Sequence, residues 1–352
     1  MSRHADAAPT AKTQTRSDAI LTCRDLSVEF TMDRGTSTVL NGLDIDIERN
    51  EIIGIVGESG SGKSMFASAL LDAVVEPGVT TGTITYRPAE GREIDVLDRS
   101  DDQLQQLRWE DISMVFQGAL SSFNPTLKLR GHFVETLEAH GYDVESGMER
   151  THELLSDLYL DPGRVLGSYP HELSGGMKQR ALIALSLVLE PDVLVMDEPT
   201  AALDLLMQRS IISLLSALRE KYDLTMVFIT HDLPLVTKLA DRIGVLYAFE
   251  LAEVSGTEEL LRSPRHPYTR ALLNSTPDIE SPLAEMQPIE GSAPDPVDVP
   301  PGCPYHERCP LATADCAAVK PAMEAASETH DVACHYWERV PDEIDLTTEV
   351  SR

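Results

Sequence analysis

Short apolar runs alternate with amphipathic segments along most of the first 260 or so residues. Ile45–Glu48 alternates apolar and polar side chains, whereas Ile52–Val56 is apolar throughout, so a half-buried strand and a fully buried strand are expected. An apolar helix is expected over Met65–Val75, and Pro77-Gly78 ends it. Further along, the pattern predicts a helix at Leu205–Glu220 and strands at Thr83–Tyr86, Val193–Met196, Met226–Ile229 and Ile243–Leu246. This alternation of strands and helices predicts an α/β fold.

Two other parts of the chain have a different composition. Residues from about 101 to 185 are polar and helix-rich, with breaks at Asn124-Pro125 and Asp161-Pro162-Gly163, and they predict a helical insert. Residues 276–304 contain eight Pro and show little periodicity, which predicts a small loop-rich C-terminal domain. The predicted organisation is a disordered polar tail at 1–20, an α/β domain at 21–261, a loop-rich domain at 262–341 and an acidic tail at 342–352.

The charge balance excludes some functions and suggests an environment. The chain has 58 acidic and 29 basic residues, a formal net charge of −29. Because the acidic residues are dispersed, we interpret the excess as halophilic, suited to a cytoplasm whose salt screens self-repulsion. The alternative is an acidic surface that binds a basic partner. Nucleic-acid binding is not expected, because phosphate contacts need clustered Lys and Arg. The sequence has no apolar run of about 18 residues that would span a membrane.

Residues 57–64 form a glycine-rich phosphate-binding motif, G-x-x-x-x-G-K-[ST]. Its residues are Gly57, Glu58, Ser59, Gly60, Ser61, Gly62, Lys63 and Ser64. The motif lies between a predicted strand and a predicted helix, the context in which backbone N–H groups wrap a β-phosphate. Lys63 is expected to reach the β- and γ-phosphates, and Ser64 to offer its hydroxyl to Mg²⁺.

Polar residues follow three other predicted strands. Asp197 is expected to hold Mg²⁺, and the neighbouring Glu198 to orient or deprotonate the attacking water. Gln117 is a candidate for contact with both Mg²⁺ and that water. His231 is expected to hydrogen-bond the γ-phosphate, because it follows a strand at the ligand-binding edge of the sheet. The structural alternatives are a strand-end cap for the two acids, a surface Gln and a packed His.

Leu173–Met177 offers a second anion site. The hydroxyl of Ser174 and the unobstructed backbone N–H groups of Gly175 and Gly176 precede a predicted helix, and a helix N-terminus attracts anions. Two phosphate-binding surfaces on one chain suggest that each nucleotide is clamped between two lobes.

Taken in this order, the motifs resemble those of the ATP-binding cassette (ABC) family over residues 21–260. Gly57–Ser64 is similar to its Walker A loop, Leu173–Met177 to its signature, and Val193–Glu198 to its Walker B strand. Gln117 resembles the Q-loop residue, Ala202-Leu203-Asp204 the D-loop and His231 the switch histidine. The resemblance implies a P-loop NTPase that binds ATP and Mg²⁺ in a head-to-tail pair of lobes.

The same resemblance assigns further contacts. Ser174 and Gly176 of one lobe would face the γ-phosphate held by the other lobe's counterpart of Lys63. An aromatic residue that stacks on adenine is expected near position 30, and Phe30 is the candidate, although a strand Phe is also a natural core residue. Met177 departs from the Gln that is commonest in the family, and Ala201 stands where Ser or Thr is common.

A narrower resemblance is to the oligopeptide/dipeptide importer ATPases. It rests on Met114–Gln117, Ser121–Pro125 and above all Ser263–Leu273, which contains His-Pro-Tyr-Thr. It implies an ATPase at the cytoplasmic face of the membrane with two permease subunits and a second ATPase subunit, either a related paralogue or a copy of itself. An extracytoplasmic solute-binding protein would act indirectly. Gly118-Ala119 departs from the Asp-Pro common there, at a position where the family is expected to contact the membrane subunits.

Four of the five cysteines fall in the last fifth of the chain: Cys303, Cys309, Cys316 and Cys334. A reducing cytosol favours metal ligation over disulfides for such a group. The C-x2-C pairs favoured by zinc ribbons are absent, and the wider loops suit a [4Fe-4S] cluster. The importer subfamily's C-terminal domain can carry such a cluster. In this chain the cluster would cross-link and stabilise the Pro-rich segment. Zinc or no metal are the alternatives.

The predicted function is therefore that of the ATP-hydrolysing subunit of an ABC importer of di- or oligopeptides. One alternative is an importer of nickel or another small solute from the same subfamily. Another is a soluble regulatory ABC ATPase in which the cysteine group senses metal and ATP hydrolysis is regulatory.

Overall fold

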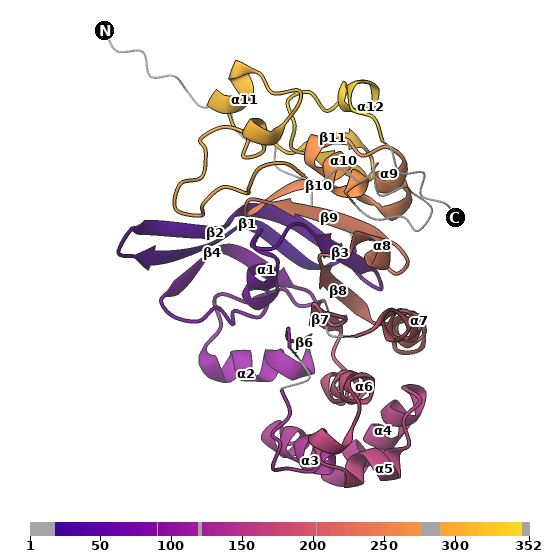
Figure 1. Cartoon of the computed structure of the whole chain (residues 1–352). Helices are drawn as coiled ribbons and strands as arrows, with labels where there is room; N and C mark the ends of the chain where they lie inside the picture. The colour runs from indigo at the N-terminus through magenta and orange to yellow at the C-terminus, as the bar shows by residue number, and fades with distance from the viewer. Residues whose placement is uncertain (1–17, 90, 119–121, 202, 276–288, 347–352) are drawn as a thin grey trace.

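The computed structural model describes residues 18–89, 91–118, 122–201, 203–275 and 289–346, which form two sheets (Figure 1). The smaller sheet is antiparallel, has the order β2-β1-β4-β5 and comes from the N-terminal part of the chain. Its strands are β1 (Ala19–Met32), β2 (Gly35–Glu48), β4 (Gly78–Tyr86) and β5 (Ile94–Asp95).

The larger sheet has the order β11-β12-β10-β9-β3-β8-β7-β6. Strands β9, β3, β8, β7 and β6 are parallel, and β10, β12 and β11 extend them in antiparallel pairing. The last two strands come from the predicted C-terminal domain, so that domain shares a sheet with the α/β domain. The strands are β3 (Ile52–Val56), β6 (Ile112–Val115), β7 (Val193–Asp197), β8 (Thr225–Thr230), β9 (Arg242–Tyr247), β10 (Glu250–Gly256), β11 (Glu324–Ser327) and β12 (His330–Val332).

The helices fall into three groups (Figure 1). Those near the sheets are α1 (Lys63–Ala69), α2 (Asp101–Glu110), α7 (Leu205–Tyr222) and α8 (Leu233–Val236). The helical insert contains α3 (Leu129–Ala139), α4 (Val144–Asp157), α5 (Pro162–Gly167), the 3-10 turn η2 (Pro170–Glu172) and α6 (Gly175–Ser186). The C-terminal region adds α9 (Thr257–Arg262), α10 (Pro267–Asn274), η3 (His306–Arg308), α11 (Ala314–Ala318) and α12 (Val340–Glu343).

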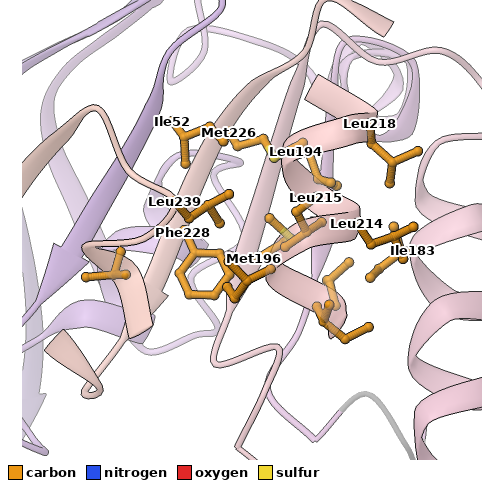
Figure 2. Packing of buried hydrophobic residues seen from close by; sticks show 14 of the residues in the cluster. Ile52, Ile183, Leu194, Met196, Leu214, Leu215, Leu218, Met226, Phe228 and Leu239 are labelled. Atoms are coloured by element: carbon orange, nitrogen blue, oxygen red, sulfur yellow. The ribbon is translucent and has the colours of Figure 1, made fainter. Parts of the chain in front are cut away.

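The core explains why several strands are apolar throughout. Along β8, Met226 and Phe228 pack in one hydrophobic cluster, whereas Val227 and Ile229 pack in the other. Figure 2 shows the first cluster, where leucines of α7 lie over Met226 and its neighbours on β7. Both faces of the parallel strands are therefore covered, which requires a continuous apolar run instead of an alternating one.

The structure departs from the sequence prediction at the end of helix α1 and adds detail within the helical insert. Helix α1 ends at Ala69, earlier than Val75, because Asp72 adopts a left-handed φ of 46° and the N–H of Ala73 turns back to the Ser68 carbonyl. Strand β6 ends two residues before Gln117, as the expected strand end there requires. It lies inside the stretch from about 101 to 185 that was predicted to be helix-rich, and it pairs with β7 as an edge of the parallel sheet.

Both predicted tails overlap residues that the structure describes. Ala19 and Ile20 are buried in β1, so these two residues of the predicted N-terminal tail belong to a strand. Residues 340–343 form α12, and the Asn274 side chain donates to the Asp345 carbonyl at 3.0 Å. Residues 1–17 and 347–352, which make up the rest of the two tails, lie outside the described residues, as do Ala119 and Ala202.

Candidate functional site

The parallel strands bring the predicted catalytic residues to one edge of the larger sheet. The order β3-β8-β7-β6 places the carboxyl ends of these strands side by side. The phosphate-binding loop follows β3, His231 follows β8, Asp197 and Glu198 end β7, and Gln117 follows β6. This is the edge at which open α/β sheets bind ligands.

The glycines of the loop are required by its shape. A Cβ on Gly57 would lie 2.1 Å from the Leu246 carbonyl oxygen, and one on Gly62 would lie 2.5 Å from the Val39 carbonyl oxygen. Gly62 also has a φ of 103°, which favours glycine. The loop therefore holds its backbone close to two other strands and turns directly into α1 at Lys63.

The Lys63 side chain extends across the phosphate-binding loop and hydrogen-bonds its backbone. Its side-chain ammonium donates to the carbonyl oxygens of Gly57 and Glu58, each at 2.8 Å, and the residue is 6% exposed. Burial lowers the pKa of Lys63, and the negative charges of Glu198, Asp197 and Glu58 act in the opposite direction. The ammonium thus lies among the groups that the sequence predicts to surround a phosphate.

The Asp197 carboxylate provides the observation that fits a metal ion. The residue is 3% exposed, accepts a hydrogen bond from the Ser64 side chain, and has a pKa raised mainly by burial. Its Oδ1 atom is buried without a hydrogen-bond partner among the described residues. A buried carboxylate oxygen beside a hydroxyl is a donor set that Mg²⁺ prefers. Gln117 is exposed at the neighbouring strand end.

Glu198 and His231 form a direct contact. His231 Nδ1 lies 2.8 Å from Glu198 Oε1, and the side chains are 57% and 11% exposed for His231 and Glu198 respectively. Glu198 has a φ of 50°, in the left-handed region that is costly for a non-glycine residue. The backbone therefore turns the Glu198 carboxylate towards His231. The sequence placed both residues at this edge, but their contact was not predicted.

The predicted second anion site lies in another part of the molecule. Ser174 caps α6, accepting from the Met177 N–H at 3.3 Å, and α6 belongs to the helical insert, away from α1 (Figure 1). Gly176 is buried where a Cβ would lie 2.1 Å from the end of the Met207 side chain. Asp204 caps α7 by accepting from the N–H groups of Leu206 and Met207. The site is therefore not completed by the phosphate-binding loop of the same chain.

Phe30 remains a candidate without supporting geometry. It lies in β1 beside Gly78 of β4, where a Cβ on Gly78 would come within 2.7 Å of the Phe30 ring. The ring is partly buried against the second hydrophobic cluster. This contact gives Phe30 a packing role, and its predicted contact with adenine stays a prediction.

The four C-terminal cysteines line one small cavity, which also has His266 and aromatic side chains in its wall. Burial raises the pKa of Cys303 to about 11 and that of Cys334 to about 12, and the negative charges of neighbouring cysteines act in the same direction. Within the ranges that the structure describes, no group of three or more His, Cys, Asp or Glu side chains is arranged to hold a metal ion.

The sequence prediction missed the connection between the C-terminal region and the phosphate-binding loop. The Tyr268 hydroxyl, from the His-Pro-Tyr-Thr segment, accepts a hydrogen bond from the Glu58 N–H at 2.9 Å. Tyr268 is fully buried and packs against Tyr247 and Tyr305, with ring centroids 4.4 and 5.5 Å away. The His-Pro-Tyr-Thr segment could have indicated this connection, because the hydroxyl of a buried tyrosine needs a hydrogen-bond partner.

The fold and the site together define a P-loop ATPase of the ATP-binding cassette class. The ABC transporter family profile matches residues 40–201, and the profile of the oligopeptide/dipeptide transporter C-terminal region matches residues 252–316. The chain therefore belongs to the ABC transporter ATPases, in the group that carries this C-terminal region. Among the described residues no helix is long and apolar enough to cross a membrane.

Similar proteins agree with this assignment. A dipeptide transport ATP-binding protein of Caldanaerobacter subterraneus is 39% identical over 91% of this chain and 97% of its own length. An oligopeptide transport ATP-binding protein of Escherichia coli is 36% identical over 88% and 91% respectively. The dimeric structure of a bacterial ABC transporter cassette is 26% identical, with a TM-score of 0.58, and covers 67% of this chain and 98% of its own. A second structure of that cassette holds ADP and Pi after hydrolysis.

Proposed function

We propose that this chain is the ATP-hydrolysing subunit of an importer of di- or oligopeptides, acting at the cytoplasmic face of the membrane. The observation that carries the proposal is one sheet that joins an ATPase edge to an oligopeptide/dipeptide transporter C-terminal region. The names of relatives that match nearly the whole chain support peptide as the cargo. Those relatives do not favour nickel import or a regulatory ATPase.

At the sheet edge each residue has a proposed role in ATP hydrolysis. The loop from Gly57 to Gly62 wraps the β-phosphate, and Lys63 transfers its hydrogen bonds from loop carbonyls to the β- and γ-phosphates. Ser64, Asp197 and Gln117 would hold Mg²⁺, which supplies charge neutralisation to the phosphates. Glu198 removes a proton from the attacking water, and His231 orients the Glu198 carboxylate and contacts the γ-phosphate.

The remaining nucleotide contacts come from a second ATPase lobe. Ser174, Gly175 and Gly176 would face the γ-phosphate bound by that lobe, with Asp204 beside the interface. The separation of α6 from α1 within one chain supports this arrangement. ATP binding would then favour the closed pair and hydrolysis the open one, which is how nucleotide state becomes a conformational change. The second lobe is a related paralogue or another copy of this chain.

A groove beside Gln117 is the proposed docking site for permease subunits. It lies between the β6 end and α3, and Trp109, Phe116, Phe123 and His132 are among its lining residues. Phe116 is 51% exposed, which is unusual for a Phe next to a buried strand. A short helix from each of two permease subunits would bury this ring. A change at the ATP site would then reach the groove, and through it the permease, by way of Gln117.

Purification of the intact complex tests the transport function. The full chain, tagged and extracted from its own membranes in detergent, is expected to bring two polytopic membrane subunits and an ATPase partner, identified by mass spectrometry. Its ATPase rate in vesicles should rise with the peptide-loaded binding protein. A chain that hydrolyses ATP without any membrane partner, and responds to loss of metal, would support the regulatory alternative instead.

For the cysteine cavity we propose a [4Fe-4S] cluster held by Cys303, Cys309, Cys316 and Cys334. Their convergence on one cavity supports it, and the cluster would have a structural role. Protein purified without oxygen is expected to contain iron and sulfide and to absorb broadly near about 400 nm. Cys309→Ser should lose the iron. Cys23→Ala is the control for loss of a thiol, because Cys23 is buried in β1 and is not one of the residues that line the cavity. Colourless, iron-free protein would refute the cluster.

For the acidic surface we propose adaptation to high salt. With a net charge of −29, unfolding relieves repulsion that salt otherwise screens. Raising KCl from about 0.1 M to about 1 M shortens the Debye length from about 10 Å to about 3 Å, so the melting temperature is expected to rise by several degrees. Differential scanning fluorimetry measures this shift. An unchanged or lower melting temperature would favour an acidic surface for a basic partner.

A further inference from the structure

An ion pair joins the C-terminal region to the phosphate-binding loop. Arg308, at the end of η3, donates from Nη1 to Glu58 Oε2 at 2.8 Å and from Nη2 to Glu58 Oε1 at 3.0 Å. The two residues are 250 positions apart, and their side chains are 6% and 28% exposed for Arg308 and Glu58 respectively. A two-point pair with so little exposure fixes geometry better than a surface pair does.

The Arg308 guanidinium is held on its other sides as well. Its Nε donates to the Glu290 carbonyl at 2.7 Å, and Nη1 also reaches the Tyr247 hydroxyl at 3.2 Å. The rings of Tyr247 and Tyr305 lie 5.6 and 5.7 Å from the guanidinium carbon. Because these partners use the planar fork of the guanidinium, a lysine could not reproduce them.

Glu58 is held at three points, and two of them lead to the C-terminal region. Its carboxylate binds Arg308, its N–H donates to the Tyr268 hydroxyl, and its carbonyl accepts from the Lys63 ammonium. The Glu58 carboxylate also places a negative charge on a loop whose ligand is itself an anion. A paired Arg308 neutralises this charge at the point where it would oppose phosphate binding.

We propose that Arg308 is a positioning residue for the ATPase: through Glu58 it holds the phosphate-binding loop in the form that accepts ATP. The proposal rests on the nucleotide-binding role assigned above to the loop. Arg308 does not touch the nucleotide. By pairing with the Glu58 carboxylate, Arg308 keeps that negative charge neutralised and turned to the C-terminal region, so an unpaired carboxylate does not turn into the loop and oppose the phosphate.

The test compares Arg308→Gln, Arg308→Lys and the double variant Arg308→Gln/Glu58→Gln in the full chain. Arg308→Gln leaves the Glu58 carboxylate unpaired, so the Kd for a fluorescent ATP analogue and the KM for ATP should rise by about tenfold. The kcat should change by less than about threefold, because the proposed catalytic groups are untouched. Removing the carboxylate in the double variant should restore the Kd to within about threefold of wild type. Arg308→Lys should fall in between.

Arg262→Gln is the control, because its ion pair with Glu258 is exposed and lies outside the site. Melting curves show whether each variant is folded. An unchanged Kd in folded Arg308→Gln or Arg308→Lys overturns the proposal. So does a double variant as weak as Arg308→Gln, since Arg308 would then be only a structural residue. Wild-type protein that fails to bind the ATP analogue would instead contradict the nucleotide role of the loop.

Discussion

Replacing Glu198 with Gln is expected to lower the ATPase kcat by about 10²–10⁴-fold while ATP still binds. The amide can keep a hydrogen bond to His231 but cannot accept a proton from the attacking water. The left-handed backbone at position 198 is equally costly for both side chains, so folding should be unaffected. Because hydrolysis is proposed to reopen the closed pair, the variant should also accumulate an ATP-bound dimer. Single-turnover assays measure the rate, and size-exclusion chromatography with ATP measures the dimer.

Glu220→Gln serves as the matched control for Glu198→Gln. Glu220 is exposed on α7, away from the sheet edge, and the same change there should leave turnover unaltered. Turnover by Glu198→Gln at the wild-type rate would remove Glu198 from the role of base. A variant that loses both ATP binding and turnover would indicate that the carboxylate supports the site instead of the proton transfer.

Replacing Lys63 with Met is expected to weaken ATP binding by about 100-fold, a loss of about 2.7 kcal/mol. Methionine fills a similar volume, but it cannot donate to phosphate oxygens. It also leaves Asp197 and Glu198 without the nearby cation that the Lys63 ammonium provides. Both effects act on ATP affinity, because the site then repels an anionic ligand. Isothermal titration calorimetry with ATP and Mg²⁺ measures the change in Kd.

A measurement of stability distinguishes the loss of ATP affinity in Lys63→Met from misfolding of the variant. The Gly57 and Glu58 carbonyls lose a donor in Lys63→Met, and each lost hydrogen bond costs about 1 kcal/mol in unfolding free energy. A modest fall in the melting temperature is therefore expected. Lys238→Met, at an exposed position, controls for the loss of a charge. ATP affinity within a few-fold of wild type in folded Lys63→Met would contradict the proposed phosphate contact.

The sheet edge that carries the proposed catalytic residues was largely predictable, because these residues follow strands that the local pattern identifies. The apolar runs Ile52–Val56 and Met226–Ile229 match β3 and the middle of β8. Once such strands are parallel neighbours, the polar residues after them must meet at one edge. The contact of His231 with Glu198 was not predictable, since it depends on a left-handed turn at a non-glycine residue.

Short strands and the ends of helices were predicted less well, because they also depend on tertiary contacts. Strand β6 is four residues long and lies within a polar, helix-rich stretch. The short apolar run before Gln117 indicates a strand end there, but the bounds of the strand follow from its pairing with β7. Likewise, the periodicity that favours a helix to Val75 gives no signal for the left-handed turn at Asp72 that ends α1. Short elements depend on tertiary partners more than on their own sequence.

The sequence by itself determined the α/β class, the phosphate-binding loop, the acidic strand end and the resemblance to peptide importer ATPases, because each is encoded in contiguous residues. The tertiary structure alone decided that β11 and β12 complete the larger sheet and that Arg308 and Tyr268 hold Glu58. It also decided that four distant cysteines share one cavity. Such contacts join segments up to 250 positions apart, and hydrophobic periodicity within one window carries no information about them.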